Sequence, residues 1–345
     1  MSIIGIKEDI QAVLKEYDID VTGIKTESYK GKKGVWWIDT PAGQKILKKE
    51  AYSYKTLEFI IAAMEHLMSN GIHMPEIIRT KKGNKYVLLD KTCYILSEAI
   101  AGKSLDYGSS ESIKRVVQEL AKFHKASKGF EAPTDCKIRT HLGGWVEKYR
   151  EQVKKVKTYY DLEYSESDHS KFGKIILQEF PYFYERMEKA ITGTDQPSYY
   201  QWVDEVRQAG GLCHQDFTAG NLILNKANDI FVLDTDSITI DIPLRDIRKL
   251  LNKIMKRRGE WDLILVKDIL KWYQMKNPLK DRQWKVLNPT LTYPHLFVGI
   301  MSKYYERREK TWTEEKYLKR LKEMIKIEKS IDPIIENADI ILPLS

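Results

Sequence analysis

Cysteine is scarce in this chain, which has only Cys93, Cys136 and Cys213. No two of them form a C-x-x-C pair, so their spacing argues against a zinc site and against a disulfide framework. Cys213 stands next to His214, but adjacent residues of an extended chain point in opposite directions. We therefore interpret Cys213 as a small buried residue rather than as the nucleophile of a cysteine hydrolase.

Long apolar segments are also missing, and no run approaches the roughly 18 apolar residues that a membrane-spanning helix needs. The first residues, Met-Ser-Ile-Ile-Gly-Ile-Lys-Glu-Asp, contain no apolar core of a signal peptide. The chain has no internal repeat, and it has no zinc finger, RNP motif or basic zipper. We therefore expect a globular protein made in the cytoplasm, with neither a membrane nor a nucleic acid as its partner.

Positive charge is in excess, and the excess lies towards the C-terminus. The whole chain has a net charge of +8, and residues 251–345 alone hold 20 Lys and Arg against 13 Asp and Glu, a net of +7. A basic segment of this kind can attract an anionic substrate, a nucleic acid or an acidic protein. Glutamates are interleaved with basic residues at 307–310 and 314–316, which is typical of exposed helix faces, and we favour that simpler interpretation.

Two short apolar runs near the middle of the chain predict a β-hairpin. Residues 222–224 and 230–233 are joined by Asn-Lys-Ala-Asn-Asp, which has the length and composition of a hairpin loop. In an antiparallel pair, the residue that enters the first strand lies beside the residue that leaves the second. We therefore expect Asn221 and Asp234 to lie side by side, with two oxygen ligands at one rim of the hairpin.

These two residues and Asp216 have the side chains that phosphoryl transfer needs. Magnesium bound with a nucleotide takes only one or two carboxylates and an amide or water oxygen from the protein, because the phosphates supply much of its coordination shell. Asn221 and Asp234 are therefore the predicted metal ligands. Asp216 precedes the hairpin, where its carboxylate can accept the proton of an attacking hydroxyl. Asp216 and Asn221 are also common turn residues, but the following strand and its terminal Asp234 favour the catalytic interpretation.

The pattern His214-x-Asp216-x4-Asn221, followed by a hydrophobic strand and Asp234, resembles the catalytic core of protein kinases and, more closely, of aminoglycoside phosphotransferases and choline kinases. Kinases have arginine at the middle position of the first triplet and the phosphotransferases have glycine, whereas this chain has Gln215. A side chain at this position can alter the conformation of the loop or the access of the acceptor. The resemblance implies ATP or GTP and Mg²⁺ as cofactors.

The resemblance also implies an α+β fold of two lobes, as in protein kinases and aminoglycoside phosphotransferases. We expect residues 1–100 to form an N-terminal nucleotide-binding lobe with a small antiparallel β-sheet and one main helix. Residues 101–345 would form a larger, mainly helical C-terminal lobe that contains the catalytic loop and the substrate region.

Within the N-terminal lobe, the segment Ile46-Leu47-Lys48 is similar to the strand whose lysine binds the phosphates of the nucleotide. Lys48 is the predicted lysine, although Lys45 and Lys49 are close enough to leave the register open. The helix that follows has Glu58 in its first turns, where the fold places the acid that holds this lysine. Glu65 is the alternative acid.

Two further segments of this lobe resemble nucleotide-binding parts of the same fold. Glu98, Ala99 and Ile100 are the predicted hinge between the lobes, where backbone amide and carbonyl groups would bind the edge of the adenine. Gly31 and Gly34 are a reduced form of the glycine-rich turn that covers the phosphates, because a bare backbone can approach them closely.

Four segments in and around the hairpin together resemble a narrower family. The catalytic loop (residues 214–221), the segment 232–237 and residues 241–250 with 259–262 are together similar to the spore coat protein S (CotS) family of endospore-forming bacteria, whose members share the aminoglycoside phosphotransferase fold. The resemblance runs from about Tyr29 to Met324. It implies synthesis in the mother cell and then residence in the spore coat, with other spore coat proteins as candidate partners. Asp246 resembles the acid that braces the catalytic loop in the phosphotransferases.

Three functions remain as hypotheses. The first is an ATP- and Mg²⁺-dependent phosphotransferase that acts on a hydroxyl of a small molecule or saccharide, with Asp236 as a candidate second metal contact. The second is a catalytically silent scaffold of the spore coat, which the sparse glycine turn and Gln215 favour and the set Asp216, Asn221 and Asp234 opposes. The third is a protein kinase, which is disfavoured because no clear activation segment follows the hairpin. The net charge of +7 over residues 251–345 also makes a polycationic acceptor such as an aminoglycoside less attractive.

Overall fold

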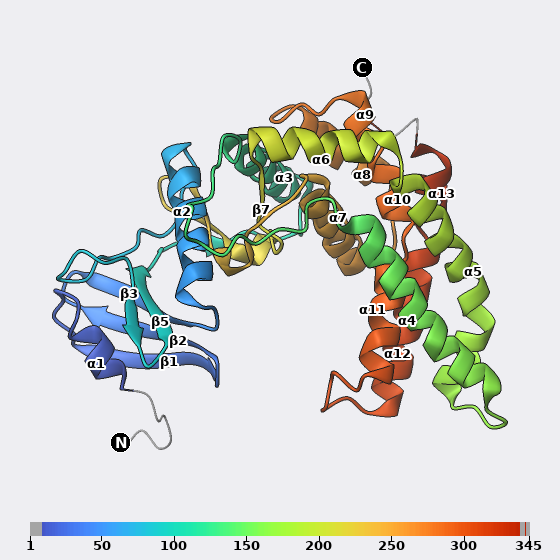
Figure 1. Ribbon diagram of the computed structural model, residues 1–345, viewed down its shortest axis with the longest axis horizontal. Coiled ribbons are helices and arrows are strands. Elements are labelled where there is room, and N and C mark those ends of the chain that lie inside the picture. Colours follow the sequence, from blue (N-terminus) through green and yellow to red (C-terminus); the bar gives the residue numbers. More distant parts are fainter. Residues whose placement is uncertain (1–8, 339–341, 343–345) are drawn as a thin grey trace. The chain divides into compact units, whose positions relative to one another are not determined.

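The computed structural model describes residues 9–338 and 342, and these residues divide into two compact units (Figure 1). Unit 1 extends from the first described residue to Leu105 and includes Phe130–Arg139 and Gly220–Ile238. Unit 2 comprises Asp106–Gly129, Thr140–Ala219 and the described residues from Thr239 onwards. The sequence-based division placed one boundary near residue 100, whereas here the predicted hairpin groups with the N-terminal segment, because its first strand pairs with residues 103–104.

Unit 1 is built on a five-stranded antiparallel sheet with the strand order β1-β2-β3-β5-β4. Its helices and strands are α1 (Ile10–Leu14), β1 (Gly23–Lys30), β2 (Lys33–Thr40), β3 (Gly43–Glu50), α2 (Tyr54–Ser69), β4 (Val87–Leu89), β5 (Thr92–Glu98), β6 (Lys103–Ser104), β8 (Leu222–Leu224), β9 (Ile230–Val232) and the 3₁₀ turn η2 (Thr235–Ser237); the 3₁₀ turn η1 (Ala219–Asn221) leads into β8.

The two faces of this sheet are covered by different helices, because side chains alternate along each strand. Leu47 of β3 packs in a cluster with Ile10 and Val13 of α1. On the other face, Leu57 and Ile61 of α2 pack with Cys93 of β5. Strand β3 lies in the middle of the sheet between β2 and β5, so its alternate residues are placed firmly towards one helix or the other.

The predicted hairpin is confirmed. Strands β8 and β9 pair in antiparallel register, with Leu222 opposite Val232 and Leu224 opposite Ile230. Strand β6 completes a three-stranded sheet in the order β6-β8-β9. The segment before β4 also joins this sheet, because the Val232 amide donates to the carbonyl of His73 at 2.8 Å.

Unit 2 is mainly helical. Its elements are α3 (Ser110–Ala126), α4 (Trp145–Ser165), α5 (Lys171–Thr194), α6 (Pro197–Ala209), β7 (Leu212–Cys213), β10 (Thr239–Ile240), α7 (Leu244–Arg258), α8 (Leu263–Gln274), α9 (Asp281–Trp284), α10 (Leu287–Thr292), α11 (His295–Tyr305), α12 (Glu314–Lys329) and α13 (Asp332–Glu336).

Aromatic side chains pack the long helices of this unit together. Helices α4, α5, α11 and α12 run side by side (Figure 1). The rings of Phe172 and Tyr304 stack with their centroids 3.7 Å apart, and those of Phe183 and Phe297 stack at 4.0 Å. These contacts join α5 to α11, and such pairs add to the stabilisation that comes from burying the rings. No helix in the described part of the chain has the length and apolar character needed to cross a membrane.

Candidate functional site

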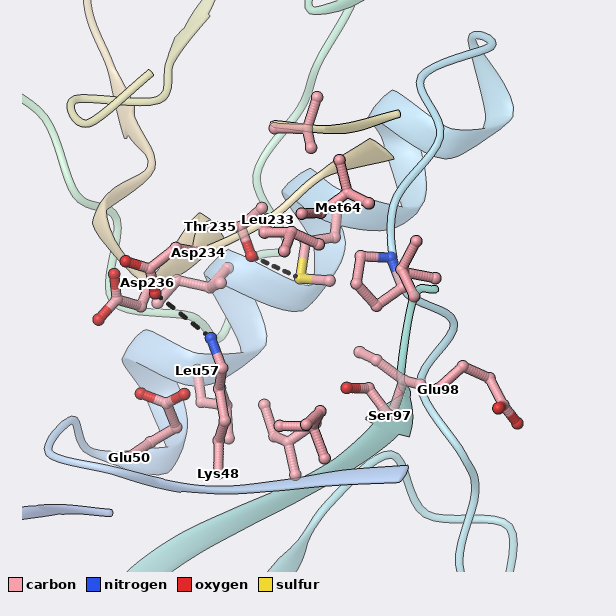
Figure 2. A pocket seen from close by; sticks show the side chains of 18 of the residues that line it. Lys48, Glu50, Leu57, Met64, Ser97, Glu98, Leu233, Asp234, Thr235 and Asp236 are labelled. Atoms are coloured by element: carbon pink, nitrogen blue, oxygen red, sulfur yellow. Dashed lines mark hydrogen bonds and ion pairs between the residues drawn. The ribbon is translucent and has the colours of Figure 1, made fainter. Parts of the chain in front are cut away.

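Unit 1 contains a cavity of about 330 Å³ between the β3–β5 part of the sheet, helix α2 and the β8–β9 hairpin. Most of its lining is apolar, with side chains such as Ile46, Leu57 and Val232. Charged side chains gather at one end, where Lys48, Glu50, Asp234 and Asp236 lie together, whereas Ser97 and Glu98 lie at the other end (Figure 2). A largely apolar cavity with a few converging polar groups is the usual form of a small-molecule site.

Of the three candidate lysines, only Lys48 lines this cavity. Lys48 lines the cavity, and its Nζ lies 3.3 Å from Oδ1 of Asp234 (Figure 2). Lys45 instead forms an ion pair with Glu98, with Nζ 2.6 Å from Oε2, and Lys49 donates to the carbonyl of Gly31 at 2.7 Å. Because β3 alternates between its two faces, only Lys48 follows Ile46 into the cavity.

Besides Asp234, the acid near Lys48 is Glu50, and no Lys48–Glu58 ion pair occurs among the described residues. The Glu58 carboxylate forms a hydrogen bond with the Tyr86 hydroxyl, and both residues line another cavity of unit 1. The alternative acid, Glu65, pairs with Lys85 at 2.7 Å. Glu50 lines the same cavity as Lys48, and burial raises the pKa of Glu50 although the charge of Lys48 opposes the shift.

The predicted hinge residues lie at the other end of this cavity, and Glu98 and Ile100 line it. The amide of Glu98 donates to the carbonyl of Glu76 at 3.0 Å, and that of Ala99 donates to the carbonyl of Gln44 at 3.2 Å. In the described part of the chain, the amide of Ile100 donates to no protein acceptor. Ile100 is therefore the residue of the three whose amide is available to a ligand.

Asn221 lies at the rim of the hairpin beside Leu233, the residue before Asp234, but unlike Asp234 it does not line the cavity. The amide of Leu233, next to Asp234, donates to the carbonyl of Asn221 at 2.8 Å. Asp234 has a left-handed backbone conformation with φ of 58° and ψ of 49°, which aspartate tolerates better than most residues. A carboxylate and an amide are oxygen donors of the kind that Mg²⁺ prefers, so the chemistry of this pair fits the predicted metal site.

Asp236, two residues after Asp234, contacts two basic side chains. Lys33, at the start of β2, forms an ion pair with Asp236, and the guanidinium of Arg139 donates to the Asp236 carbonyl. Gly34 has a packing role, since a Cβ at this position would lie 2.3 Å from the ring of the buried Trp36. The glycines of this turn therefore do not by themselves identify a phosphate-binding loop.

Asp216 belongs to unit 2, whereas the other predicted site residues belong to unit 1. Its Oδ1 lies 2.7 Å from Nζ of Lys253 on α7, and both side chains are about half exposed, at 47% and 46%. The Asp216 amide donates to Nδ1 of His214 at 3.3 Å, which fixes the loop before the carboxylate. The carboxylate thus stands next to a lysine and close to solvent.

The unusual residue Gln215 is held by several contacts. Its φ is 72°, in the left-handed region that glycine adopts without strain. Nε2 of Gln215 donates to Thr239 Oγ1 at 2.7 Å, and Lys249 Nζ donates to the carbonyl and Oε1 of Gln215 at 2.5 and 3.0 Å. These bonds stabilise a conformation that a non-glycine residue rarely takes.

The predicted role of Asp246 as a brace of the catalytic loop is confirmed. Its carboxylate accepts the amides of His214 at 2.6 Å and Gln215 at 2.9 Å, and Nε2 of His124 lies 3.3 Å away. Burial raises the pKa of Asp246, but the hydrogen bonds and charges of the two histidines outweigh burial and hold the pKa below its ordinary value. Cys213 is also buried here, and its thiol donates to the carbonyl of Ile242 at 3.2 Å.

Sequence reasoning missed several residues next to the predicted ones. Glu50 could have been found, because Ile46, Lys48 and Glu50 alternate along one strand and must share a face. Lys33 had no signal, since its partner Asp236 is 203 residues away. Lys253 follows Lys249 by one helical turn, which indicates a shared helix face but not the carboxylate that this face contacts.

Solved structures of phosphotransferases resemble this fold over nearly the whole chain. An aminoglycoside phosphotransferase from Alicyclobacillus acidocaldarius matches with a TM-score of 0.77 and 16% identity, covering 97% of this chain and 98% of that one. A spectinomycin phosphotransferase solved with ADP and spectinomycin matches with a TM-score of 0.64 and 16% identity, covering 99% of both chains. At this identity the likeness shows a common fold, the two-lobed kinase-like α+β fold with an antiparallel sheet and a helical majority.

Sequence comparison identifies the family. Spore coat protein S of Bacillus subtilis (strain 168) is 32% identical over 327 residues, which cover 95% of this chain and 93% of that protein. Residues 13–338 match the family described as "Spore coat putative kinase YutH". The match includes the lysine strand, the catalytic loop, the hairpin and helix α7. The chain therefore belongs to the YutH family of kinase-like spore coat proteins.

Proposed function

We propose that this protein is an ATP- and Mg²⁺-dependent phosphotransferase that phosphorylates a hydroxyl of a small molecule or saccharide. We further propose that it is made in the mother cell and then resides in the spore coat, as the name of its relative suggests. The observation that carries the proposal is the cavity in unit 1, where Lys48 meets Asp234 beside a largely apolar pocket.

The cavity has suitable groups for each part of the nucleotide. The apolar side chains can hold the adenine ring, and the amide of Ile100 is available to its edge. Lys48 would bind the phosphates, with Glu50 as the neighbouring acid. Asn221 and Asp234 would hold Mg²⁺, which neutralises phosphate charge when bound. In the free protein, Lys48 and Asp234 contact each other, so neither charge is left without a partner.

Asp216 would orient the acceptor hydroxyl and take its proton. Lys253, 2.7 Å from this carboxylate, keeps a positive charge beside it. The amides of His214 and Gln215, bound to buried Asp246, hold the loop before Asp216 in one conformation. Catalysis of this kind depends mainly on positioning and on charge neutralisation, so a rigid loop contributes directly to the rate.

Thermal unfolding with and without Mg²⁺-ATP tests the nucleotide site. A ligand that binds only the native state adds about 2.7 kcal/mol of stability when its free concentration is about 100 times the Kd, so the midpoint must rise. We expect the rise in the wild type and in Asp18→Ala, which removes an exposed acid of unit 1 outside the cavity. It should disappear in Asp234→Ala. No rise in the wild type at millimolar nucleotide would contradict the proposal.

The second candidate is a catalytically silent coat protein with the same fold. The observation that favours it is that Lys48 and Lys33 pair directly with Asp234 and Asp236, the acids that a metal would need. A well-folded wild type with no response to Mg²⁺-ATP, together with binding to other spore coat proteins, is the result expected of such a scaffold.

A further inference from the structure

A second cavity, of about 270 Å³, lies beside Asp216 and within unit 2. Its lining contains a single carboxylate, that of Asp216, and four basic side chains. The basic residues are Arg248, Lys249, Lys253 and Lys256, all on helix α7. The remaining lining is neutral and includes Asn252 and Leu296.

The basic side chains line this cavity because of the periodicity of α7. Arg248 and Lys249 are adjacent, and Lys253 and Lys256 follow Lys249 at successive spacings of four and three residues, which places the row along one side of the helix. The opposite side is buried, with Ile247, Leu251 and Ile254 in the core. The sequence of this helix therefore presents a continuous row of positive charge to the cavity next to Asp216.

Most of this positive charge has no acidic partner. Lys253 pairs with Asp216, but within the part of the chain that the structure describes Arg248, Lys249 and Lys256 form no ion pair. Lys249 donates only to neutral groups of Gln215. Burial lowers the pKa of Lys249 to about 8 although the charge of Asp246 opposes the shift, and burial followed by repulsion from Arg320 and Lys303 lowers the pKa of Lys256.

Arg248 extends this basic surface into a neighbouring cavity of about 110 Å³, which it lines together with Lys148 and Arg245. Arg245 is neutralised there by an ion pair with buried Asp241, whereas Arg248 is not. Burial lowers the pKa of Arg248, and the surrounding charges do not overcome this effect. A partly buried guanidinium without a carboxylate is costly unless a ligand anion completes it.

We propose that the cavity beside Asp216 binds a hydroxylated small molecule that bears a carboxylate or phosphate group. The anionic group would contact Arg248, Lys249 and Lys256, and a hydroxyl of the same molecule would face Asp216. Guanidinium binds both kinds of anion through paired hydrogen bonds, so a sugar acid and a sugar phosphate share the required chemistry. A polycationic acceptor would be repelled by the same side chains.

This inference rests on the proposed function for the fate of the hydroxyl. In that reaction, the hydroxyl oxygen forms a bond to the γ-phosphorus of ATP while the bond from that phosphorus to the bridging oxygen of ADP breaks. The hydroxyl proton goes to Asp216 and then to water, and ADP leaves with the electron pair of the broken bond. Binding of the anion itself requires no nucleotide, so it can be measured separately.

Calorimetric titration of the full chain without nucleotide tests the inference, with glucose 6-phosphate, glucuronate, glucose and glucosamine as the probes. We expect at least one of the two anionic sugars to bind at least tenfold more tightly than glucose, and glucosamine to bind no better than glucose. The comparison of the phosphate with the carboxylate shows which anion the cavity prefers. Arg248→Gln should weaken the anionic sugar about tenfold, since it removes a charge-assisted contact.

Two further variants keep the result interpretable. Lys256→Gln changes an exposed position of the same row and should weaken binding severalfold even if Arg248→Gln does not fold. Lys267→Gln removes an exposed charge of α8 that lines neither cavity, and it should leave binding unchanged. Equal binding of glucose and both anionic sugars, no binding of any probe, or equal losses in all three variants would overturn the inference.

A second measurement separates this inference from the proposed function. Phosphorus NMR with Mg²⁺-ATP should show a new phosphate ester on the sugar that binds. If the anionic sugar binds with the expected dependence on Arg248 but no ester forms and Mg²⁺-ATP causes no thermal shift, the anion site stands and the phosphotransferase proposal fails. If only glucose or glucosamine is phosphorylated, the phosphotransferase stands and the anion site fails.

Discussion

Replacing Asp246 with asparagine should destabilise unit 2 and its catalytic loop. The Asp246 side chain is completely buried, and it accepts the amides of His214 and Gln215 on different oxygens. Asparagine has nearly the same shape but offers only one acceptor oxygen. Its NH₂ group must therefore face one of the two amide donors, whichever way the side chain is turned.

The size of the effect follows from these contacts. Hydrogen bonds to a charged group contribute about 1.5–3 kcal/mol each, and neutral ones about 1 kcal/mol. The variant keeps one weakened bond and leaves one buried donor without an acceptor, which costs about 1–3 kcal/mol more. We expect a loss of about 3 kcal/mol in the free energy of unfolding. For a unit of this size that corresponds to a fall in Tm of about 6–12 °C.

Urea denaturation and calorimetry of the full chain measure this loss, and Asp204→Asn is the matched control. Asp204 has an exposed side chain paired with Arg207 on the same helix, so its replacement should change stability little. The Asp246 variant should still bind Mg²⁺-ATP through unit 1, but it should lose phosphoryl transfer. An Asp246→Asn protein that unfolds within about 2 °C of the wild type, which is about 1 kcal/mol or less, would refute the reasoning.

Three further predictions follow from single contacts. Gly34→Ala should destabilise the protein by about 1–3 kcal/mol, because its Cβ would overlap the buried ring of Trp36, and thermal unfolding with Gly299→Ala as a control checks this. At position 215, the glycine variant should be about 1 kcal/mol more stable than the alanine variant in urea, since both lose the side-chain bonds but only glycine accepts a φ of 72° without strain. The urea midpoint of the Lys249→Met protein should fall relative to that of the wild type as pH rises from 8 towards 10.5. Burial lowers the pKa of Lys249 to about 8 in the folded state, so in this window the unfolded state holds the extra proton and higher pH favours folding; a constant difference would contradict this.

Much of the fold was readable from local patterns. The apolar spacing of residues 222–224 and 230–233 and their polar loop predicted the hairpin, and antiparallel pairing placed Asn221 next to the residue before Asp234. The role of Asp246 followed from the resemblance to phosphotransferases, and the structure supplies its two backbone donors. These predictions succeeded because each depends on neighbours in sequence or on a strongly specific motif.

The partners of the charged residues were less predictable. Glu58 was the expected partner of Lys48, yet it contacts Tyr86, and Asp234 and Glu50 lie near the lysine instead. The position of an acid on a helix is known from sequence only to within a turn, because the rotation of the helix against the sheet is set by packing. A rotation of a few tens of degrees is enough to point a carboxylate into another cavity.

The sequence by itself determined the elements and the chemical groups: a strand with three candidate lysines, a hairpin that begins after Asn221 and ends before Asp234, and the acid Asp246 that braces the preceding loop. Tertiary structure alone decided which of three lysines enters the cavity, which acid meets it, and that basic residues of α7 line a cavity together with Asp216. The physical reason is the sequence distance over which each interaction acts. Strand alternation and helical period act over a few residues, whereas Lys48 and Asp234 are 186 residues apart and meet only when the sheet, the hairpin and α2 have packed together.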